Sequence, residues 1–420
     1  MNRANRPRKA RISGSSFDSR AMSRAGDGST LSLDFTTGVL DPRVTFTRST
    51  TATYINSSGY VTSAAINEAR FDYDSSTLAL RGLLIEGPAT NLTTRSDSFD
   101  DTGNLSWLAS GMTRTATSAT SPKGITETVA LIAGNGSFRS NTITVTASTL
   151  YTFSFWAKNN SGTQARYRVW NATAGSSIVD YTLPGSNYIS SINNTTWTRI
   201  SVSFTTPVGC TSVFVYPCSS DTAGTNVFLW GAQLEVGAAA TSYVTSTASQ
   251  GTRSQDNAII AAGAAFSGWY TGGLNGTFYA DWYGGVAGAS GTQRSVLATD
   301  DVTTKHLHLY QTATTNTMTL ANFGGGSTIA TSNAISPAGS RSKSAFSYAT
   351  SAMNLCLNGG TVASGTVTGF TVAPTWLSLG GPSTSGTAIT GTTVMLNNSI
   401  RAIKYWPTVL PNTTLQSLTA

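Results

Sequence analysis

The chain has 420 residues, which is too long for one ordinary hydrophobic core, so two or three domains are expected. Charged residues make up only 11% of it, and Lys and Glu are too scarce to solvate long surface helices. Gly, Ser, Thr and aromatic residues are abundant, which favours strands and tight turns. The composition therefore predicts an all-β protein.

The formal charge of +7 is concentrated at the N-terminus. Roughly +6 of it falls in the first 26 residues, from Arg3, Arg6, Arg8, Lys9, Arg11, Arg20 and Arg24 less Asp18. The remaining body is close to neutral and lacks the broad basic face of a nucleic-acid-binding domain, so nucleic acid is not an expected partner. Residues 1–27 hold almost no large apolar side chains, which predicts a basic arm that orders only against a partner.

No run of residues approaches the 18 or more apolar residues of a membrane span, and the first 16 residues lack the apolar centre of a secretory signal. A soluble protein made in a cytosol is expected, with no membrane partner. The three cysteines, Cys210, Cys218 and Cys356, have no paired spacing and are interpreted as small buried hydrophobes. A bridge between Cys210 and Cys218 would require an oxidising site.

After the arm, residues 28–90 read as short alternating segments broken by Gly, Asp-Pro and Ser-Ser. They predict a β-rich collar whose core is too small to stand alone. Residues 91–247 carry the strongest strand signal, and regular short strands at this spacing indicate a sandwich or jelly roll. The expected strands are 151–158, 166–170, 199–204, 211–216 and 226–234.

A second set of strands fills residues 248–420, after a small polar stretch at 246–254 that we interpret as the boundary. The expected strands are 277–283, 305–310, 318–323, 343–348, 353–357, 376–379 and 399–406, and the pattern predicts a second antiparallel sandwich. A Thr cap before an apolar i, i+3 pair at 411–418 predicts one closing helical turn.

Two strands of the first set offer a basic and aromatic outer face. If Phe153 and Phe155 point to the core, period-two alternation places Trp156 and Lys158 outward. The same rule places Arg166, Arg168 and Trp170 outward on the next strand. Aromatic faces with fixed polar donors are typical of carbohydrate contacts, so these five residues are the candidate glycan-binding platform. The alternative is that these aromatics pack against neighbouring subunits or the collar.

Few residues are candidates for metal binding or catalysis. His306 and His308 alternate with leucines and are expected on a solvated sheet face, without a third ligand for a metal. Asp300 and Asp301 are weak candidates for a structural calcium, and a turn that favours Asp is the alternative. The acids are scattered without the close pair that glycoside hydrolysis needs, so no catalytic residues and no cofactor are predicted.

Specific motifs carry a family resemblance. Residues 33–74 (LDFTTGVLDPRVTFTRSTTATYINSSGYVTSAAINEARFDYD) and 81–99 (RGLLIEGPATNLTTRSDSF) resemble the collar of phage-encoded fibre and head-spike proteins. NLTTRS at 91–96, YTFSFWAK at 151–158, WGAQLEVG at 230–237 and TSYV at 241–244 look like the jelly-roll carbohydrate-binding modules of those proteins. GTFY at 276–279, LNGG at 357–360 and IRAIKYWP at 400–407 are similar to laminin-G or concanavalin-like lectin sandwiches.

The resemblance implies a bacteriophage head or tail fibre or spike, assembled in the host cytoplasm and exposed on the virion surface. Its implied partners are a host surface polysaccharide, bound without catalysis, and other virion proteins. Arg3, Arg6, Arg8, Lys9 and Arg11 would dock the arm on an acidic capsid, collar or tail surface, the alternatives being a solubilising tail or contact with packaged DNA. Homo-oligomers, with trimers favoured, are expected. A polysaccharide depolymerase and a purely structural decoration are the alternative functions.

Overall fold

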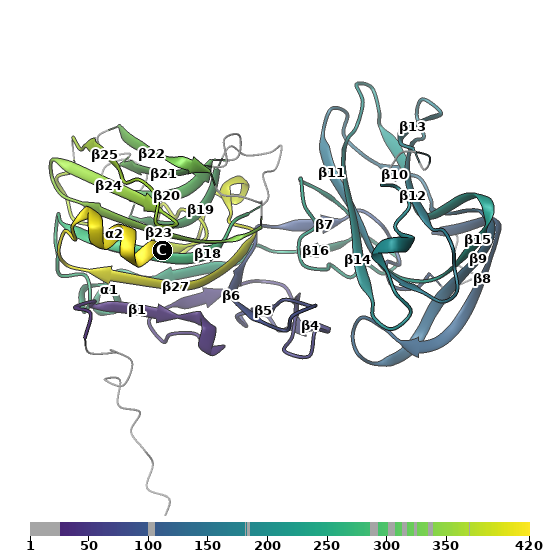
Figure 1. The fold of residues 1–420 in the computed structure, drawn as a ribbon, viewed down its shortest axis with the longest axis horizontal. Helices are drawn as coiled ribbons and strands as arrows, with labels where there is room; N and C mark the ends of the chain where they lie inside the picture. The colour runs from purple at the N-terminus through teal and green to yellow at the C-terminus, as the bar shows by residue number, and fades with distance from the viewer. Residues whose placement is uncertain are drawn as a thin grey trace, which may run out of the picture.

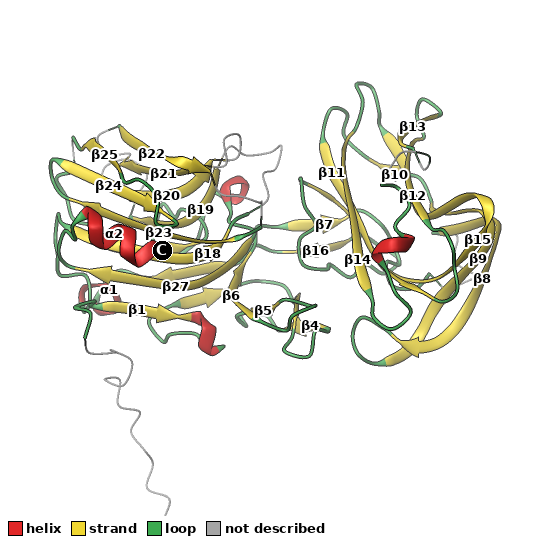
Figure 2. Cartoon of the chain, in the orientation of Figure 1, coloured by secondary structure: helices red, strands yellow, loops and turns green. Residues whose placement is uncertain are grey.

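The computed structural model describes residues 26–99, 106–180, 182, 185–285, 293–300, 307–312, 317–322, 326–334, 339–368 and 370–420. These residues form two β bodies joined by a narrow ribbon (Figure 1). Helix is confined to short pieces, chiefly α1 (Ala264–Ser267) and α2 (Asn412–Thr419) (Figure 2). The all-β prediction is confirmed. No helix within the described residues is long and apolar enough to cross a membrane.

The larger body is a sandwich of two antiparallel sheets. The first has the order β25-β24-β23-β18-β27-β6-β5, with β1 also paired to β27. Its strands are β25 (Ala363–Thr366), β24 (Ala352–Leu357), β23 (Arg341–Tyr348), β18 (Gly276–Tyr283), β27 (Asn398–Trp406), β6 (Leu80–Ile85), β5 (Phe71–Tyr73) and β1 (Leu31–Asp34). The second has the order β2-β17-β26-β19-β20-β21-β22. Its strands are β2 (Thr45–Thr47), β17 (Asn257–Ile260), β26 (Leu377–Leu379), β19 (Gln293–Thr299), β20 (Leu307–Thr312), β21 (Thr317–Asn322) and β22 (Ser327–Ala334).

Strands from the two ends of the chain complete this sandwich together. Leu31 pairs with Tyr405 and Phe46 with Ala258, so the N-terminal segment enters both sheets. Leu33 and Phe35 are fully buried in the same core as the C-terminal strands. The sequence predicts a β-rich collar at 28–90 whose core is too small to stand alone. In the structure, strands of this segment gain a core by pairing with distant strands of the sandwich.

The smaller body is a jelly roll with one connected network of strands. Its central order is β13-β12-β15-β11-β14, with β10, β9 and β8 added through β15 and β9. The strands are β8 (Trp107–Thr120), β9 (Thr126–Ser140), β10 (Ile143–Thr144), β11 (Leu150–Asn159), β12 (Arg166–Asn171), β13 (Ser176–Val179), β14 (Thr198–Thr205) and β15 (Ser212–Val236). The first part of β15 pairs with β12 and the later part with β11, so β15 spans the body. Cys210, Cys218 and Cys356 are all buried and unbridged, as interpreted from the sequence.

The ribbon between the bodies is the pair β7 (Ala89–Asn91) and β16 (Gly251–Arg253). It lies between the sandwich and the jelly roll in Figure 1. The chain therefore leaves the sandwich after β6, builds the jelly roll, and returns to complete the sandwich. A separate hairpin, β3 (Ala52–Ile55) and β4 (Val61–Ala64), pairs only within itself among the described strands.

Candidate functional site

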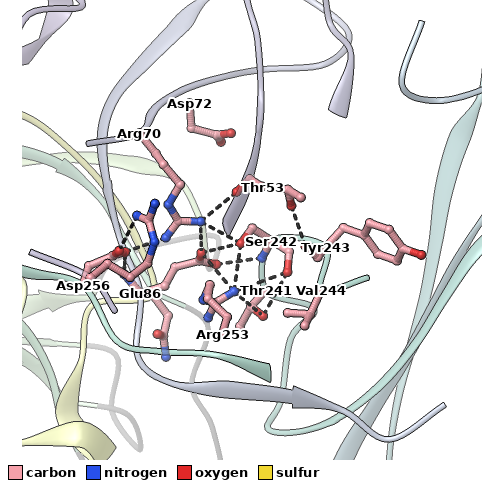
Figure 3. Close-up of polar contacts among 12 residues, drawn as sticks. Thr53, Arg70, Asp72, Glu86, Thr241, Ser242, Tyr243, Val244, Arg253 and Asp256 are labelled. Carbon is pink, nitrogen blue, oxygen red and sulfur yellow. Dashed lines mark hydrogen bonds and ion pairs between the residues drawn. The ribbon is translucent and has the colours of Figure 1, made fainter. Parts of the chain in front are cut away.

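A buried ion-pair network lies where the two bodies meet (Figure 3). Arg70 contacts Asp256 at 2.5 Å and Glu86 at 2.7 Å, and Arg253 lies 3.2 Å from Glu86. Arg48 reaches the other oxygen of Asp256 at 3.1 Å. All five side chains are buried. Burial alone would raise the pKa of Glu86, but Arg253 and Arg70 hold it at about 2, so this carboxylate stays ionised.

The network fixes the segment that returns from the jelly roll. Glu86 accepts hydrogen bonds from the backbone N of Ser242 at 2.7 Å and from its Oγ at 2.6 Å. Thr53 of β3 donates to the carbonyl oxygen of Tyr243 at 2.5 Å. Figure 3 shows the Tyr243 ring pointing away from the ion pairs. The segment is thereby held between the hairpin and the jelly-roll surface.

Tyr243 completes an aromatic cluster on the outer face of β11. Its ring centroid lies 5.3 Å from that of Trp156 and 4.9 Å from that of Trp230, and these two Trp rings are 5.4 Å apart. The guanidinium of Arg199 lies 4.5 Å from the Trp156 ring and donates to the Thr241 carbonyl at 2.7 Å. Trp156 is therefore outward on its strand but only 6% exposed.

A cleft of about 680 Å³ opens beside this cluster. We call it the junction cleft, because one wall comes from the N-terminal segment and the other from the jelly roll. Its lining residues are Ile55, Ser58, Gly59, Tyr60, Val61, Ser75 and Ser76 on the first wall and Thr120, Ser121, Pro122, Trp156, Lys158, Thr195, Thr196, Trp197, Thr198 and Arg199 on the second. Its volume lies within the range of ligand pockets, about 300–1,000 Å³.

The walls of the junction cleft combine aromatic rings, cations and hydroxyl groups. The Lys158 ammonium lies 5.3 Å from the Trp197 ring centroid, and the Trp197 indole donates to the Thr120 carbonyl at 2.7 Å. Tyr60 is 41% exposed at the tip of the β3–β4 hairpin and lies over Gly124. Hydroxyl groups can both donate and accept, so this lining suits a ligand that presents apolar faces and many hydroxyls.

A second cavity of about 420 Å³ adjoins the junction cleft and shares Ile55, Val61, Trp156 and Arg199 with it. We call it the inner chamber. It is more polar and is closed by residues of the sandwich, namely Thr53, Tyr54, Asp72, Arg81, Leu84, Glu86, Gly339, Asn397 and Asn398, together with residues 239–243. Two carboxylates, Asp72 and Glu86, thus line one cavity.

The structure divides the predicted glycan platform between two places. Trp156 and Lys158 line the junction cleft. Arg168 and Trp170 are outward on β12, as predicted, but they pair with the first part of β15 and line neither cavity. Arg168 instead lies 4.1 Å from the Trp170 ring centroid and donates to Ser177 at 3.0 Å. Arg166, on the same strand, is likewise outside both cavities.

The other predicted residues lie outside the cleft. Asp300 is buried, and its carboxylate accepts from the backbone N of Thr375 at 2.9 Å, so it braces a loop. His308 is 2% exposed, and its ring centroid lies 4.7 Å from that of Tyr310 in a tilted arrangement, which corrects the expected solvated face. Within the described residues, no group of three or more His, Cys, Asp or Glu side chains is placed to hold a metal. Asp301, His306 and the arm residues Arg3, Arg6, Arg8, Lys9 and Arg11 lie outside the described residues.

Sequence reasoning missed Tyr60, Trp197, Arg199 and Asp72. Arg199 and Ser201 alternate with core residues on β14, so the outward direction of Arg199 was readable from the pattern. Trp197 precedes that strand in the same register and could have been found this way. Tyr60 and Asp72 belong to a distant segment, and no local pattern places them against the jelly roll.

Comparison with known families supports a binding role for the smaller body. The family model described as a carbohydrate binding domain (CBM_4_9) matches residues 93–223, which is less than half of the chain. The match falls inside the jelly roll and includes every residue of the second wall of the junction cleft. A search of curated proteins finds no match.

Solved structures that match part of the chain include the CBM40 of the Ruminococcus gnavus IT-sialidase bound to α2,3-sialyllactose. The match has 17% identity and a TM-score of 0.29, over 35% of this chain and 83% of that chain. The CBM22-1 xylan-binding domain of Paenibacillus barcinonensis Xyn10C matches at 13% identity and 0.26, over 34% and 94%. The enzymatically active domain of bacteriophage CBA120 tailspike protein 4 matches at 17% and 0.25, over 35% and 21%. These low scores carry no functional implication.

Proposed function

We propose that this chain binds a glycan in the junction cleft without cleaving it, as a surface fibre or spike subunit of a bacteriophage that attaches to host surface polysaccharide. The observation that carries the binding proposal is the cleft itself. It has Trp197, Tyr60 and Trp156 as aromatic walls, Lys158 and Arg199 as cations, and a lining of Ser and Thr hydroxyls. Its jelly-roll wall lies entirely within the region matched by the carbohydrate-binding family model.

The ring and hydroxyl chemistry of the cleft fits a saccharide. The axial C–H groups of a sugar form an apolar face that packs on an aromatic ring, while its hydroxyls need donors and acceptors nearby. The Trp197 ring is held in place by its hydrogen bond to Thr120, so it is pre-organised for stacking. Pre-organisation reduces the entropy lost on binding.

The contacts of Glu86, one of the two carboxylates of the inner chamber, favour binding over hydrolysis. A glycosidase needs one carboxyl group as acid or base and a second as nucleophile or base. Glu86 is ion-paired with Arg70 and Arg253 and hydrogen-bonded to Ser242, and its pKa is held at about 2. Glu86 therefore cannot deliver a proton at neutral pH, and its oxygens are held by Arg70, Arg253 and Ser242, so they are not free to attack a sugar or activate a water.

The virion part of the proposal rests on the collar motifs at 33–74 and 81–99. The basic arm, including Arg3, Arg6, Arg8, Lys9 and Arg11, would pair with acidic groups of a capsid or tail protein. Deleting residues 1–27 should abolish incorporation into particles while leaving the soluble protein folded. Unchanged incorporation, seen on a gel of purified particles, would remove the docking role.

The binding proposal is tested with the full chain on an array of purified bacterial capsular and O-antigen polysaccharides. We expect Trp197→Ala to lower affinity at least about tenfold, because truncating a Trp at the centre of a site costs more than about 1–2 kcal/mol. Trp170→Ala is the matched control, since Trp170 is another partly exposed Trp of the same body outside the cleft. It should leave affinity within about twofold.

The reverse result, loss with Trp170→Ala and none with Trp197→Ala, would move the site to β12 and end the cleft proposal. Reducing ends are measured in the same incubations. Binding without their release supports a receptor-binding protein, and steady release would require the depolymerase alternative.

A further inference from the structure

Asp72 is the second carboxylate of the inner chamber, besides the ion-paired Glu86. It lies on β5, and its Oδ1 accepts a hydrogen bond from the backbone N of Ile55 at 2.8 Å. No ion pair to Asp72 exists among the residues that the structure describes. The carboxylate lines the cavity and is half-buried.

The charged groups around Asp72 are already engaged by other residues. Arg70 is paired with Glu86 and Asp256, and Arg81 lies 3.0 Å from Asp74. Arg199, on the jelly-roll side of the chamber, donates to Thr241 and to Ser154. Tyr54 of β3 also lines the chamber and carries no charge at neutral pH. Asp72 therefore faces an open, polar space without a cation committed to it.

This placement costs stability. Burial raises the pKa of Asp72 from 3.8 to about 6, and the Glu86 charge adds to the rise, while Ile55, Arg81 and Arg70 oppose it. A carboxylate that is harder to ionise in the fold than in water opposes folding at neutral pH. Groups of this kind, sitting in a cavity, are over-represented at functional sites.

The junction cleft and the inner chamber meet at Trp156 and Arg199, which belong to both. A saccharide that is stacked on Trp197 and extends past Trp156 and Arg199 would reach Asp72. We propose that Asp72 is a specificity-determining residue, whose carboxylate accepts hydrogen bonds from hydroxyls of a sugar residue that enters the inner chamber. This inference rests on the proposed function. It requires that the ligand carry at least one further sugar unit, rich in hydroxyls, beyond the unit stacked on Trp197.

The inference makes binding depend on pH in a defined direction. An ionised carboxylate offers acceptors only, and both oxygens can take sugar hydroxyls, whereas protonation turns one into a donor. The charges of Arg70, Arg199 and Glu86 stay constant between pH 5 and 8, because a guanidinium is not deprotonated in proteins and the pKa of Glu86 is held at about 2. Affinity should therefore fall as pH drops through 6.

The experiment compares the full chain with Asp72→Asn on the same polysaccharide array, at pH 8, 7, 6 and 5. Wild type should lose at least about threefold in affinity between pH 7 and pH 5. Asp72→Asn should bind about tenfold more weakly at pH 8, since hydrogen bonds to a charged acceptor are lost, and its affinity should not change with pH. Asp180→Asn is the control, an acid on the jelly roll that lines neither cavity, and it should follow wild type.

The outcomes separate this inference from the function on which it rests. If Trp197→Ala abolishes binding while Asp72→Asn matches wild type at every pH, Asp72 has no part in recognition and the function stands. If neither change affects binding, the cleft is not the site, and both proposals fail. Circular dichroism of each variant establishes that the fold is intact, and the wild-type pH profile tests the inference without any substitution.

Discussion

At the scale of single residues, Glu86 joins the returning segment to the sandwich by two ion pairs and two hydrogen bonds. Glu86→Gln would leave Arg70 and Arg253 buried with too little negative charge around them. Breaking a buried pair in this way costs about 3–5 kcal/mol, so the free energy of unfolding in urea should fall by that amount. Asp74→Asn, which breaks the partly exposed pair with Arg81, should cost less than about 1 kcal/mol. If Glu86→Gln and Asp74→Asn lowered the free energy of unfolding equally, the buried network would not have this stabilising role.

The low pKa of Glu86 predicts that the protein loses stability at acidic pH. Its pKa in the fold is about 2, below the ordinary 4.5, so its contribution is complete above pH 4.5 and is lost as pH falls toward 2. Thermal unfolding of wild type should show Tm falling over this interval. The Glu86→Gln protein should show a shallower fall there, and parallel curves would contradict the assignment.

The raised pKa of Asp72 predicts the opposite change of stability with pH. Its pKa is raised to about 6, so the stability linked to its protonated form is present below 3.8 and is lost as pH rises through 6. Asp72→Asn should therefore be more stable than wild type at pH 8, by on the order of 2 kcal/mol, and equal to it near pH 3.5. Denaturation at the two pH values checks this. A destabilised variant at pH 8 would mean that the carboxylate is structural.

At the scale of elements, the β3–β4 hairpin forms one wall of the junction cleft through Tyr60. Gly124 has φ of +76°, and a Cβ there would lie 2.6 Å from the Tyr60 ring. Gly124→Ala should displace Tyr60 and weaken glycan binding severalfold. Gly175→Ala is the matched control, because its φ is +66° but no atom lies within 4 Å. Both substitutions place Ala at a positive φ and should lower the free energy of unfolding by a similar amount, about 1 kcal/mol. The two variants should therefore differ only in the binding assay.

Local patterns predicted most of these elements and the direction of their side chains. Phe153 and Phe155 are fully buried, and Trp156 and Lys158 lie on the opposite face, as alternation requires. What covers that face could not be predicted, because Tyr243 and the hairpin reach Trp156 from distant parts of the chain. For the same reason, Trp170 was grouped with Trp156, although β15 carries their partners on two separate stretches.

At the scale of the whole molecule, the jelly roll is an insertion into the sandwich. The sequence boundaries near 91 and at 246–254 coincide with β7 and β16 of the ribbon. Pairing between residues such as Leu31 and Tyr405 is invisible to local patterns, so two tandem modules were expected instead. Such long-range pairing also makes folding of the sandwich depend on both ends of the chain.

This topology predicts which truncated forms of the chain can fold. Residues 248–420 alone lack β1, β2, β5 and β6. They would expose core residues of β27 such as Ile403 and Ile400, which lie opposite Leu33 and Leu83, so this fragment should aggregate. Replacing residues 93–249 by a short Gly-Ser linker should instead leave a folded sandwich, because β7 and β16 already bring the two cut ends together.

Cooperative thermal unfolding and size-exclusion chromatography of the two proteins provide the measurement. The protein in which a linker replaces residues 93–249 lacks the contacts of Glu86 with Ser242. Its Tm should therefore be lower than that of the full chain, with the transition still cooperative. A soluble, cooperative 248–420 fragment would show that the N-terminal strands are dispensable. It would also restore the tandem arrangement expected from the sequence.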